Sequence, residues 1–265
     1  MKIALIGTPK SGKTTIFNAL TGTEHNTDKY APPADEANVC IVPVIDERVT
    51  KLSEMYNPKK TIYANIEFHD FPGIFAKESD NPESAIYGDI KGCEAFVLIL
   101  RAFEDNELDE LYGKADPLRQ LSHFEDEMIL SDMVVAEKRI EKIELGYKRG
   151  VKTPAIQIEE KTLRRIISQL QENCSIRTME LAPEEEKSIR GFQFFSAKPL
   201  LILLNTSESG YTKQDTILAK LHQQGFIAEV IAGKFEEELS ALEPEEAAIF
   251  MADMGMEESI RDRLT

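Results

Sequence analysis

The sequence predicts an α/β fold, in which a mostly parallel sheet has helices on both faces and an antiparallel helical hairpin is inserted into it. Three features of the 265-residue chain lead to this prediction. Short, almost continuously apolar runs recur, as in parallel strands that are buried on both faces. A glycine-rich loop directly follows the first run. Between about residues 120 and 190 the runs stop and a helical period replaces them. The runs are Ile3–Ile6, Ala95–Leu100, Leu200–Leu204 and Phe226–Ile231.

The loop after the first strand fits the pattern G-x-x-x-x-G-K-[ST]. The residues that follow the loop can begin a helix. In such a loop, backbone N–H groups converge on phosphates at a helix N-terminus. We expect Lys13 to reach the β- and γ-phosphates and the Thr14 hydroxyl to bind Mg²⁺. The expected nucleotide-binding loop reads Gly7-Thr8-Pro9-Lys10-Ser11-Gly12-Lys13-Thr14-Thr15.

A second segment that contacts the phosphates is expected after the predicted strand Ile62–Phe68. Strands are predicted at Val39–Val42 and Ile62–Phe68, with a short helix near Arg48–Tyr56 between them and a loop over 22–38 before them. The later strand runs into Asp70-Phe71-Pro72-Gly73. In many phosphate-binding proteins such an Asp orients Mg²⁺ through water and the Gly N–H approaches the γ-phosphate. Asp70 is therefore a predicted metal ligand and catalytic residue, and Gly73 a predicted catalytic residue. An ordinary Asp-Phe-Pro-Gly turn is the alternative.

Two helical seams predict the hairpin. Apolar residues step by three and four along each helix, and residues 148–154 form a plausible turn between them. The first seam is Ile129, Met133, Ala136, Ile140, Ile143 and Tyr147, and the second is Leu163, Ile167, Leu170 and Cys174. We expect residues 120–190 to form this inserted domain and residues 1–119 with 191–265 to form the nucleotide-binding domain.

The hairpin is more basic than the rest of the chain. Residues 138–165 hold nine lysines and arginines against four glutamates. Helix pairs such as Glu144–Lys148 and Glu160–Arg164 account for part of this, which favours a solvated face. The alternative is a site for an anionic partner, RNA on the ribosome or a protein, at the tip formed by Lys148, Arg149 and Lys152.

Composition restricts the remaining possibilities. The net charge of −16 disfavours nucleic-acid binding except at a segregated basic patch. No apolar run approaches the roughly 20 residues of a membrane span. The apolar segment between the N-terminus and the glycine-rich loop is too short for a signal peptide. The three cysteines lie far apart, as reduced thiols of a cytoplasmic protein would.

A base-reading element is expected at the end of the run Leu200–Leu204, where the chain reads Asn205-Thr206-Ser207-Glu208. GTPases carry N-K-x-D here, with the Asp accepting from two guanine donors and the Lys stem covering the base. The longer Glu208 side chain moves the carboxylate, and a site built on paired donors and acceptors is sensitive to such a change. Ala232 and Gly233 complete the expected nucleotide-binding residues.

Several motifs together resemble the Obg-like ATPase (YchF) family, over essentially the whole chain. The resemblance implies a Ras-like P-loop NTPase domain with a helical insertion, Mg²⁺ as cofactor, and ATP preferred over GTP. It also implies slow hydrolysis, because Ile74 stands where Ras-like enzymes carry a water-orienting Gln. The matching segments are Met1-Lys2-Ile3, Val42-Pro43, Asp46-Glu47-Arg48, Glu67-Phe68-x-Asp70-x-x-Gly73, Arg101-Ala102-Phe103-Glu104, Gly113-Lys114-x-Asp116-Pro117, Leu130-Ser131-Asp132 and Lys198-Pro199.

The chain also departs from the family pattern. The 265 residues end near where the family's C-terminal TGS domain would begin. The family's switch threonine is replaced by Ala34 in this chain. The family's glycine-rich stretch after Gly73 is replaced by the different sequence of residues 76–82. The family's loop Asn, which in similar enzymes helps to hold K⁺, is Lys10, whose ammonium could take the place of that ion as a catalytic charge.

The sequence therefore favours a slow, ATP-preferring switch. A nucleotide-binding interaction module with little hydrolysis is one alternative. A GTPase, despite N-x-x-E, is another.

Overall fold

The structure is a computed structural model that describes residues 1–22, 37–71 and 85–264, and it divides into two compact units. The first contains residues 1–22, 37–71, 93–118 and 200–264 of the described chain. The second contains residues 85–92 and 119–199. The insert boundaries expected from the sequence, 120–190, stay a prediction. The structure groups residues 85–92 and 191–199 with the hairpin as well.

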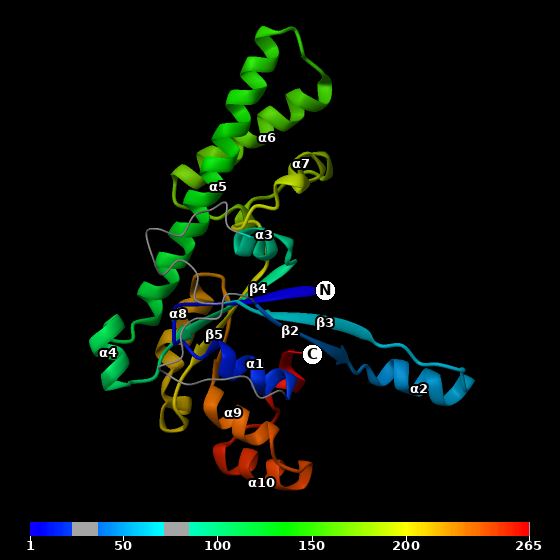
Figure 1. Cartoon of the computed structure of the whole chain (residues 1–265), viewed down its shortest axis with the longest axis vertical. Helices are drawn as coiled ribbons and strands as arrows, with labels where there is room; N and C mark the ends of the chain where they lie inside the picture. Colours follow the sequence, from blue (N-terminus) through cyan, green and yellow to red (C-terminus); the bar gives the residue numbers. More distant parts are fainter. Residues whose placement is uncertain (23–36, 72–84, 265) are drawn as a thin grey trace. The chain divides into compact units, whose positions relative to one another are not determined.

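The first unit is built on a six-stranded sheet in the order β2-β3-β1-β4-β5-β6 (Figure 1). All neighbouring strands are parallel except β2, which pairs with β3 in the antiparallel direction. This confirms the predicted mostly parallel sheet. The strands are β1 (Lys2–Ile6), β2 (Asn38–Val44), β3 (Ala64–Asp70), β4 (Ala95–Arg101), β5 (Leu200–Asn205) and β6 (Ile227–Ile231).

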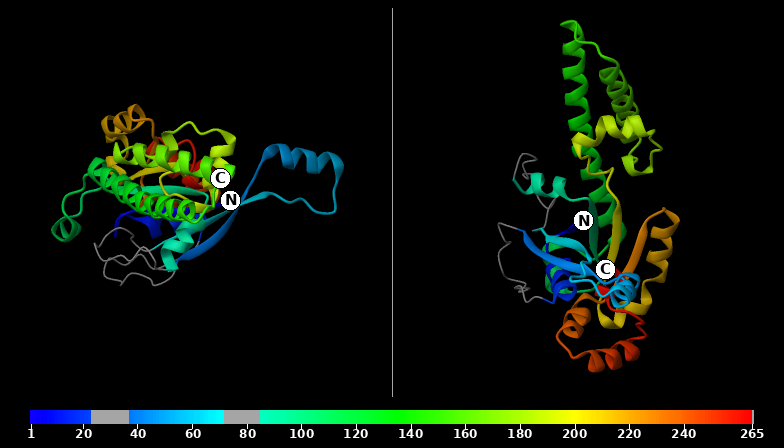
Figure 2. Two further views of the ribbon diagram at one scale, coloured as in Figure 1. Left: turned by 90° about the horizontal axis from the view of Figure 1, so that it is seen from above. Right: turned by 90° about the vertical axis from the view of Figure 1, so that its right-hand side faces the viewer.

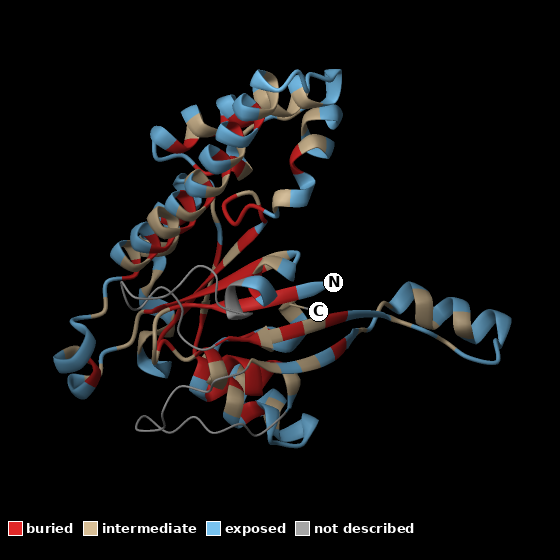
Figure 3. Ribbon diagram, turned by 45° about the horizontal axis from the view of Figure 1, so that its top comes forward, coloured by how far each residue is buried: buried red, intermediate tan, exposed pale blue. Residues whose placement is uncertain are grey.

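Burial along the central strands explains their unbroken apolar sequence. Every residue from Phe96 to Leu100 is buried, so side chains on both faces of β4 are covered (Figure 3). On one face, α1 (Lys13–Thr21) packs Ile16 and Phe17 against Phe68 and Ile99. A strand with only one covered face would instead alternate apolar and polar residues.

Several other helices of the first unit pack around this core. Helix α1 packs against α9 and α11, and α8 packs against β6. Helix α2 buries no residue, and hydrogen bonds between the hydroxyls of Thr50 and Tyr63 and between those of Ser53 and Thr61 join it to the chain that leads into β3. These helices are α2 (Glu47–Tyr56), α4 (Asn106–Tyr112), α8 (Asp215–Gln223), α9 (Gly233–Ser240), α10 (Pro244–Met254) and α11 (Ile260–Leu264).

The second unit is the predicted antiparallel hairpin together with smaller elements that pack on it (Figure 2). Helix α5 (Pro117–Lys148) ends before Gly150, which has φ +81°. Helix α6 (Pro154–Gln171) then begins at Pro154, with the Thr153 side chain accepting from the Ile156 N–H. The remaining helices are α3 (Ala85–Gly92), α7 (Pro183–Ile189) and the short turns Ile176–Thr178 and Arg190–Phe192.

The seam of α5 is confirmed, and that of α6 needs a correction. Ile129, Ala136, Ile140 and Ile143 are buried in the hairpin core. On α6, Leu163 and Leu170 are buried in this core together with Ile166, and the predicted Ile167 is partly buried against it, whereas Cys174 is exposed. Cys174 was wrongly assigned to the seam because α6 ends at Gln171, before another helical turn is complete.

One of the two expected helix pairs is present. Arg164 binds Glu160, four residues away, at 2.9 Å. The same guanidinium also reaches Glu144 on the opposite helix, at 2.9 Å. The expected Glu144–Lys148 pair is therefore replaced by a cross-hairpin pair, because one planar guanidinium can bridge two carboxylates.

Asp132 ties α5 to the segment that leads into β5. Its carboxylate accepts from the Phe195 N–H at 2.9 Å and from the Ser196 N–H at 2.7 Å. The Ser196 hydroxyl donates to it as well, at 2.7 Å. Burial raises the pKa of this carboxyl, and the three hydrogen bonds oppose that effect. Nearby, the buried Lys198 ammonium donates to the carbonyls of Ile90 and Lys91 at the end of α3.

No helix in the described parts of the chain is long and apolar enough to cross a membrane.

Replacing Asp132 by Ala is expected to lower the free energy of unfolding by about 2–3 kcal/mol, because two buried N–H groups lose their acceptor. Urea unfolding followed by circular dichroism measures this loss. Ser131→Ala, one residue away and half-buried, is the control and should change little. A parent-like Asp132→Ala protein would show that these hydrogen bonds do not stabilise the fold.

Candidate nucleotide-binding site

The loop Gly7–Thr14 follows β1 and turns directly into α1. Its backbone is left-handed at Lys10, with φ +59°, and at Gly12, with φ +95°. A Cβ atom at position 12 would collide with the side-chain amide nitrogen of Asn205, so only glycine fits there. Lys10 adopts its positive φ as a non-glycine residue, which costs free energy. The backbone of the loop therefore enters the left-handed region at these two residues, one of which is not a glycine.

Lys13 is the buried cation of this loop. Its ammonium donates to the carbonyls of Gly7 at 3.1 Å and Thr8 at 2.9 Å. Burial lowers the pKa of Lys13 to about 8; the negative charge of Asp70 opposes that shift, and the positive charge of Lys10 adds to it. A bound anion would favour the charged ammonium, so the site is electrostatically prepared for a phosphate.

Thr14 and Asp70 meet at the start of α1 and the end of β3. The Thr14 hydroxyl donates to the Asp70 carboxylate at 2.8 Å. A hydroxyl and a carboxylate are the hard oxygen donors that Mg²⁺ prefers, so this pair fits the ion, with the other positions left to phosphate and water oxygens. Within the described residues, no three His, Cys, Asp or Glu side chains gather closely enough to hold a metal by themselves.

Asn38 is a member of this site that the sequence did not reveal. It stands opposite Asp70 in the antiparallel β2–β3 register, and its amide donates to the Asp70 carboxylate at 3.3 Å. The pairing of β2 with β3 would have been the signal, and it depends on register rather than on local pattern.

Asn205 joins three segments that are far apart in the sequence. Its amide N–H donates to the Ser11 carbonyl at 2.8 Å, and its amide oxygen accepts from the Gly233 N–H at 3.0 Å. Its own carbonyl accepts from Ala102 at 2.7 Å. A Cβ at Gly233 would come within 2.8 Å of the Asn205 amide oxygen, so glycine permits this close approach. Both ends of the amide are thus bonded to the phosphate loop and to the start of α9.

The remaining predicted residues belong to the same loop or to the segments that follow β5 and β6. Thr206 and Ala232 are buried. The Thr206 N–H donates to the Ile231 carbonyl at 2.8 Å, and the backbone of Gly210 lies close to the Thr206 hydroxyl. Glu208 is exposed at the start of a short turn, Glu208–Lys213. Pro9 and Thr15 are half-buried in the loop and on α1.

Part of the predicted site lies outside the described residues. These positions are Gly73, the neighbouring Ile74, the expected switch position Ala34 and the altered stretch 76–82.

Known proteins match this chain over most of its length. The family of 50S ribosome-binding GTPases matches residues 2–130. The ribosome-binding ATPase YchF of Bacillus subtilis is 31% identical over 268 residues, which cover 98% of this chain and 73% of that protein. The corresponding protein of Haemophilus ducreyi is 28% identical, covering 97% of this chain and 72% of its own length. The structure of the Schizosaccharomyces pombe YchF GTPase superposes with a TM-score of 0.79 at 25% identity, covering 100% of this chain and 73% of that one.

The pKa of Lys13 predicts how nucleotide affinity depends on pH. With a pKa of about 8 in the free protein, the ammonium is mostly charged at pH 7 and mostly neutral at pH 9. A phosphate raises that pKa, so binding above pH 8 must take up a proton, and affinity should fall by up to about tenfold per pH unit.

Calorimetry in buffers of different ionisation enthalpy should detect an uptake of about half a proton at pH 8. Lys13→Ala is the matched control, since its residual weak binding should lack this pH dependence. Equal proton uptake by parent and variant would mean that another group titrates.

Proposed function

We propose that this chain, which belongs to the Obg-like ATPase (YchF) family, is a nucleotide-controlled switch that binds ATP with Mg²⁺ in preference to GTP and hydrolyses it slowly. The observation that carries the proposal is the grouping of Lys13, Thr14 and Asp70 around one loop, with the Lys13 ammonium buried and the Thr14 hydroxyl on the Asp70 carboxylate. This is the donor and charge arrangement that a triphosphate with Mg²⁺ requires.

Each residue has a proposed role in that reaction. Lys13 would exchange its bonds to the Gly7 and Thr8 carbonyls for phosphate oxygens. Thr14 and Asp70 would hold Mg²⁺, which offsets the phosphate charge when it is bound. The loop N–H groups would bind the phosphates at the start of α1. Asn205 would act through the backbone that it holds, as a positioning residue.

A nucleotide-binding module with little hydrolysis is the rival proposal. The departures from the family pattern at Ala34 and over 76–82 favour the rival, because those segments normally order the attacking water and the γ-phosphate. Thr14 and Asp70 favour the enzyme. Single-turnover incubation with Mg-ATP separates the two, because a pure binder leaves the nucleotide intact.

We further propose the ribosome as the partner and the cytoplasm as the location. Relatives are named ribosome-binding ATPases, and the basic hairpin offers the positive surface that ribosomal RNA requires. The sequence pointed to the tip at Lys148, Arg149 and Lys152. All three are exposed, and the Lys152 ammonium lies over the Tyr147 ring at 5.5 Å from its centre.

ATP is expected to bind more tightly than GTP. The Glu208 carboxylate cannot take the position of the Asp carboxylate in the N-K-x-D motif of GTPases, and Thr206 cannot cover a guanine as the Lys of that motif does. Competition of the two nucleotides for the purified protein measures the preference. Glu208→Asp should raise GTP affinity, and adding Thr206→Lys should raise it further. The single variant is the cleaner comparison, since Thr206 is buried against Gly210. Tighter binding of GTP by the parent would contradict the proposal.

Lys10 is expected to supply the positive charge that related enzymes obtain from K⁺. It lies close enough to Lys13 for its charge to lower the Lys13 pKa. Hydrolysis by the parent should therefore be indifferent to replacing K⁺ by Na⁺ at constant ionic strength. Lys10→Asn should lower the rate in Na⁺ and recover part of it in K⁺. A parent rate that rises severalfold with K⁺ would exclude this role.

A further inference from the structure

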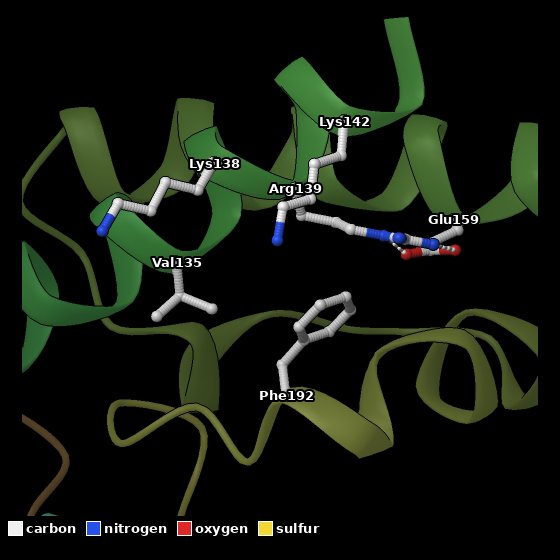
Figure 4. A pocket seen from close by; sticks show the side chains of 6 residues that line it. All are labelled: Val135, Lys138, Arg139, Lys142, Glu159 and Phe192. Atoms are coloured by element: carbon white, nitrogen blue, oxygen red, sulfur yellow. Dashed lines mark hydrogen bonds and ion pairs between the residues drawn. The ribbon is translucent and has the colours of Figure 1, made fainter. Parts of the chain in front are cut away.

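The second unit contains a groove that the proposed nucleotide site does not use. Its volume is about 400 Å³. The groove lies between α5, α6 and the turn Arg190–Phe192 (Figure 4). Its lining residues are Val135, Lys138, Arg139, Lys142, Glu159 and Phe192.

Two lysines on one wall of the groove make no ion pair with a described residue, in contrast to three of the hairpin's arginines. Lys138 and Lys142 are exposed, one helical turn apart on α5, and among the described residues neither makes an ion pair. Like charges at this spacing destabilise a helix slightly. By contrast Arg139, Arg164 and Arg165 are each paired with a glutamate. The groove is therefore lined by two ammonium groups without an ion pair to the described chain, on residues one helical turn apart.

An aromatic ring forms the opposite wall. Phe192 is half-buried and stacks on Phe194, with ring centres 5.3 Å apart and planes 23° apart. Phe194 is buried in the hairpin core, so it fixes the orientation of Phe192. In Figure 4 the Lys142 ammonium and the Phe192 ring face the same opening, with Val135 beside them.

The end of the groove is electrically neutral. Arg139 donates twice to the Glu159 carboxylate, at 2.6 and 2.9 Å. A bidentate pair satisfies both partners and leaves little charge for a ligand. An anion would therefore bind beside Lys138 and Lys142 rather than at Arg139.

The overall charge distribution favours an anion at this unit. Residues 119–199 hold fourteen lysines and arginines and fourteen acidic residues, so the net charge of −16 belongs to the rest of the chain. The groove is a place where an acidic protein combines unpaired cations with an oriented aromatic face. A phosphate and a flat, stackable group attached to it satisfy both features at once, and an acidic peptide supplies only the charge.

We propose that this groove binds single-stranded RNA, with a base stacked on Phe192 and the adjoining phosphates contacting Lys138 and Lys142. The inference deepens the proposed ribosomal partnership and rests on it. It assigns RNA contact to the groove rather than to the hairpin tip. Co-sedimentation of the parent with ribosomes, measured in parallel, distinguishes failure of this inference from failure of the proposed ribosomal partnership.

The test measures the affinity of the whole chain for a fluorescent oligouridylate of about 12 nucleotides, a length that covers one such site. Inorganic polyphosphate serves as a polyanion without bases. The Lys138→Gln/Lys142→Gln variant should bind the RNA about tenfold or more weakly, and its salt dependence should be shallower by about 1.4 in log–log slope, for two lost phosphate contacts. Lys148→Gln/Arg149→Gln, which removes the same charge at the tip, is the matched control and should stay within about twofold of the parent.

Phe192 separates stacking from charge. Phe192→Leu should weaken RNA binding by about tenfold and leave polyphosphate binding unchanged, whereas Phe192→Tyr, which keeps the ring, should bind RNA like the parent. Unchanged thermal melting and ATP affinity confirm that each variant is folded. The proposal is overturned if the parent does not bind RNA at low salt, if the tip variant loses as much as the groove variant, or if Phe192→Leu binds RNA like the parent.

Discussion

The amide of Asn205 is the interaction on which the proposed phosphate site depends. It bonds the Ser11 carbonyl in the loop and the Gly233 N–H at the start of α9. These two contacts come from segments that only the parallel sheet brings together. Glycine is needed at positions 12 and 233 because the amide approaches both backbones closely. The last residue of β5 thus fixes the loop that follows β1, and the geometry of the loop is a property of the whole sheet.

The loop also concentrates positive charge in a buried place. Lys13 is buried, its pKa is lowered to about 8, and Lys10 adds like charge beside it from a left-handed backbone. Asp70 compensates in part, and the Gly7 and Thr8 carbonyls accept the ammonium. Such an arrangement persists where the surroundings determine the conformation, and a ligand of opposite charge stabilises it. A phosphate would remove the cost that the free loop bears.

The sequence was informative wherever the signal is local. The strands and the seam of α5 follow from apolar periodicity, and the loop follows from the fixed spacing of its glycines and lysine. What escaped prediction depends on strand register, on contacts between elements or on where a helix ends. Asn38 reaches Asp70 through antiparallel pairing, Glu144 turns to Arg164 on the neighbouring helix, and Cys174 lies past the end of α6. The groove at Phe192 likewise needs α5 and the turn after α7 to be packed together.

Net charge alone is a poor guide to what this protein binds. A charge of −16 opposes any phosphate ligand at long range. Salt screens charges beyond about 8 Å at physiological ionic strength, whereas contacts within a buried loop are screened far less. The proposed nucleotide site therefore depends on Lys13, Lys10 and the loop N–H groups, and hardly on the acidic surface. The same reasoning applies to Lys138 and Lys142, whose nearest charges decide whether an anion stays. At both sites the charges close to the ligand decide binding, and the net charge of the whole chain does not reveal them.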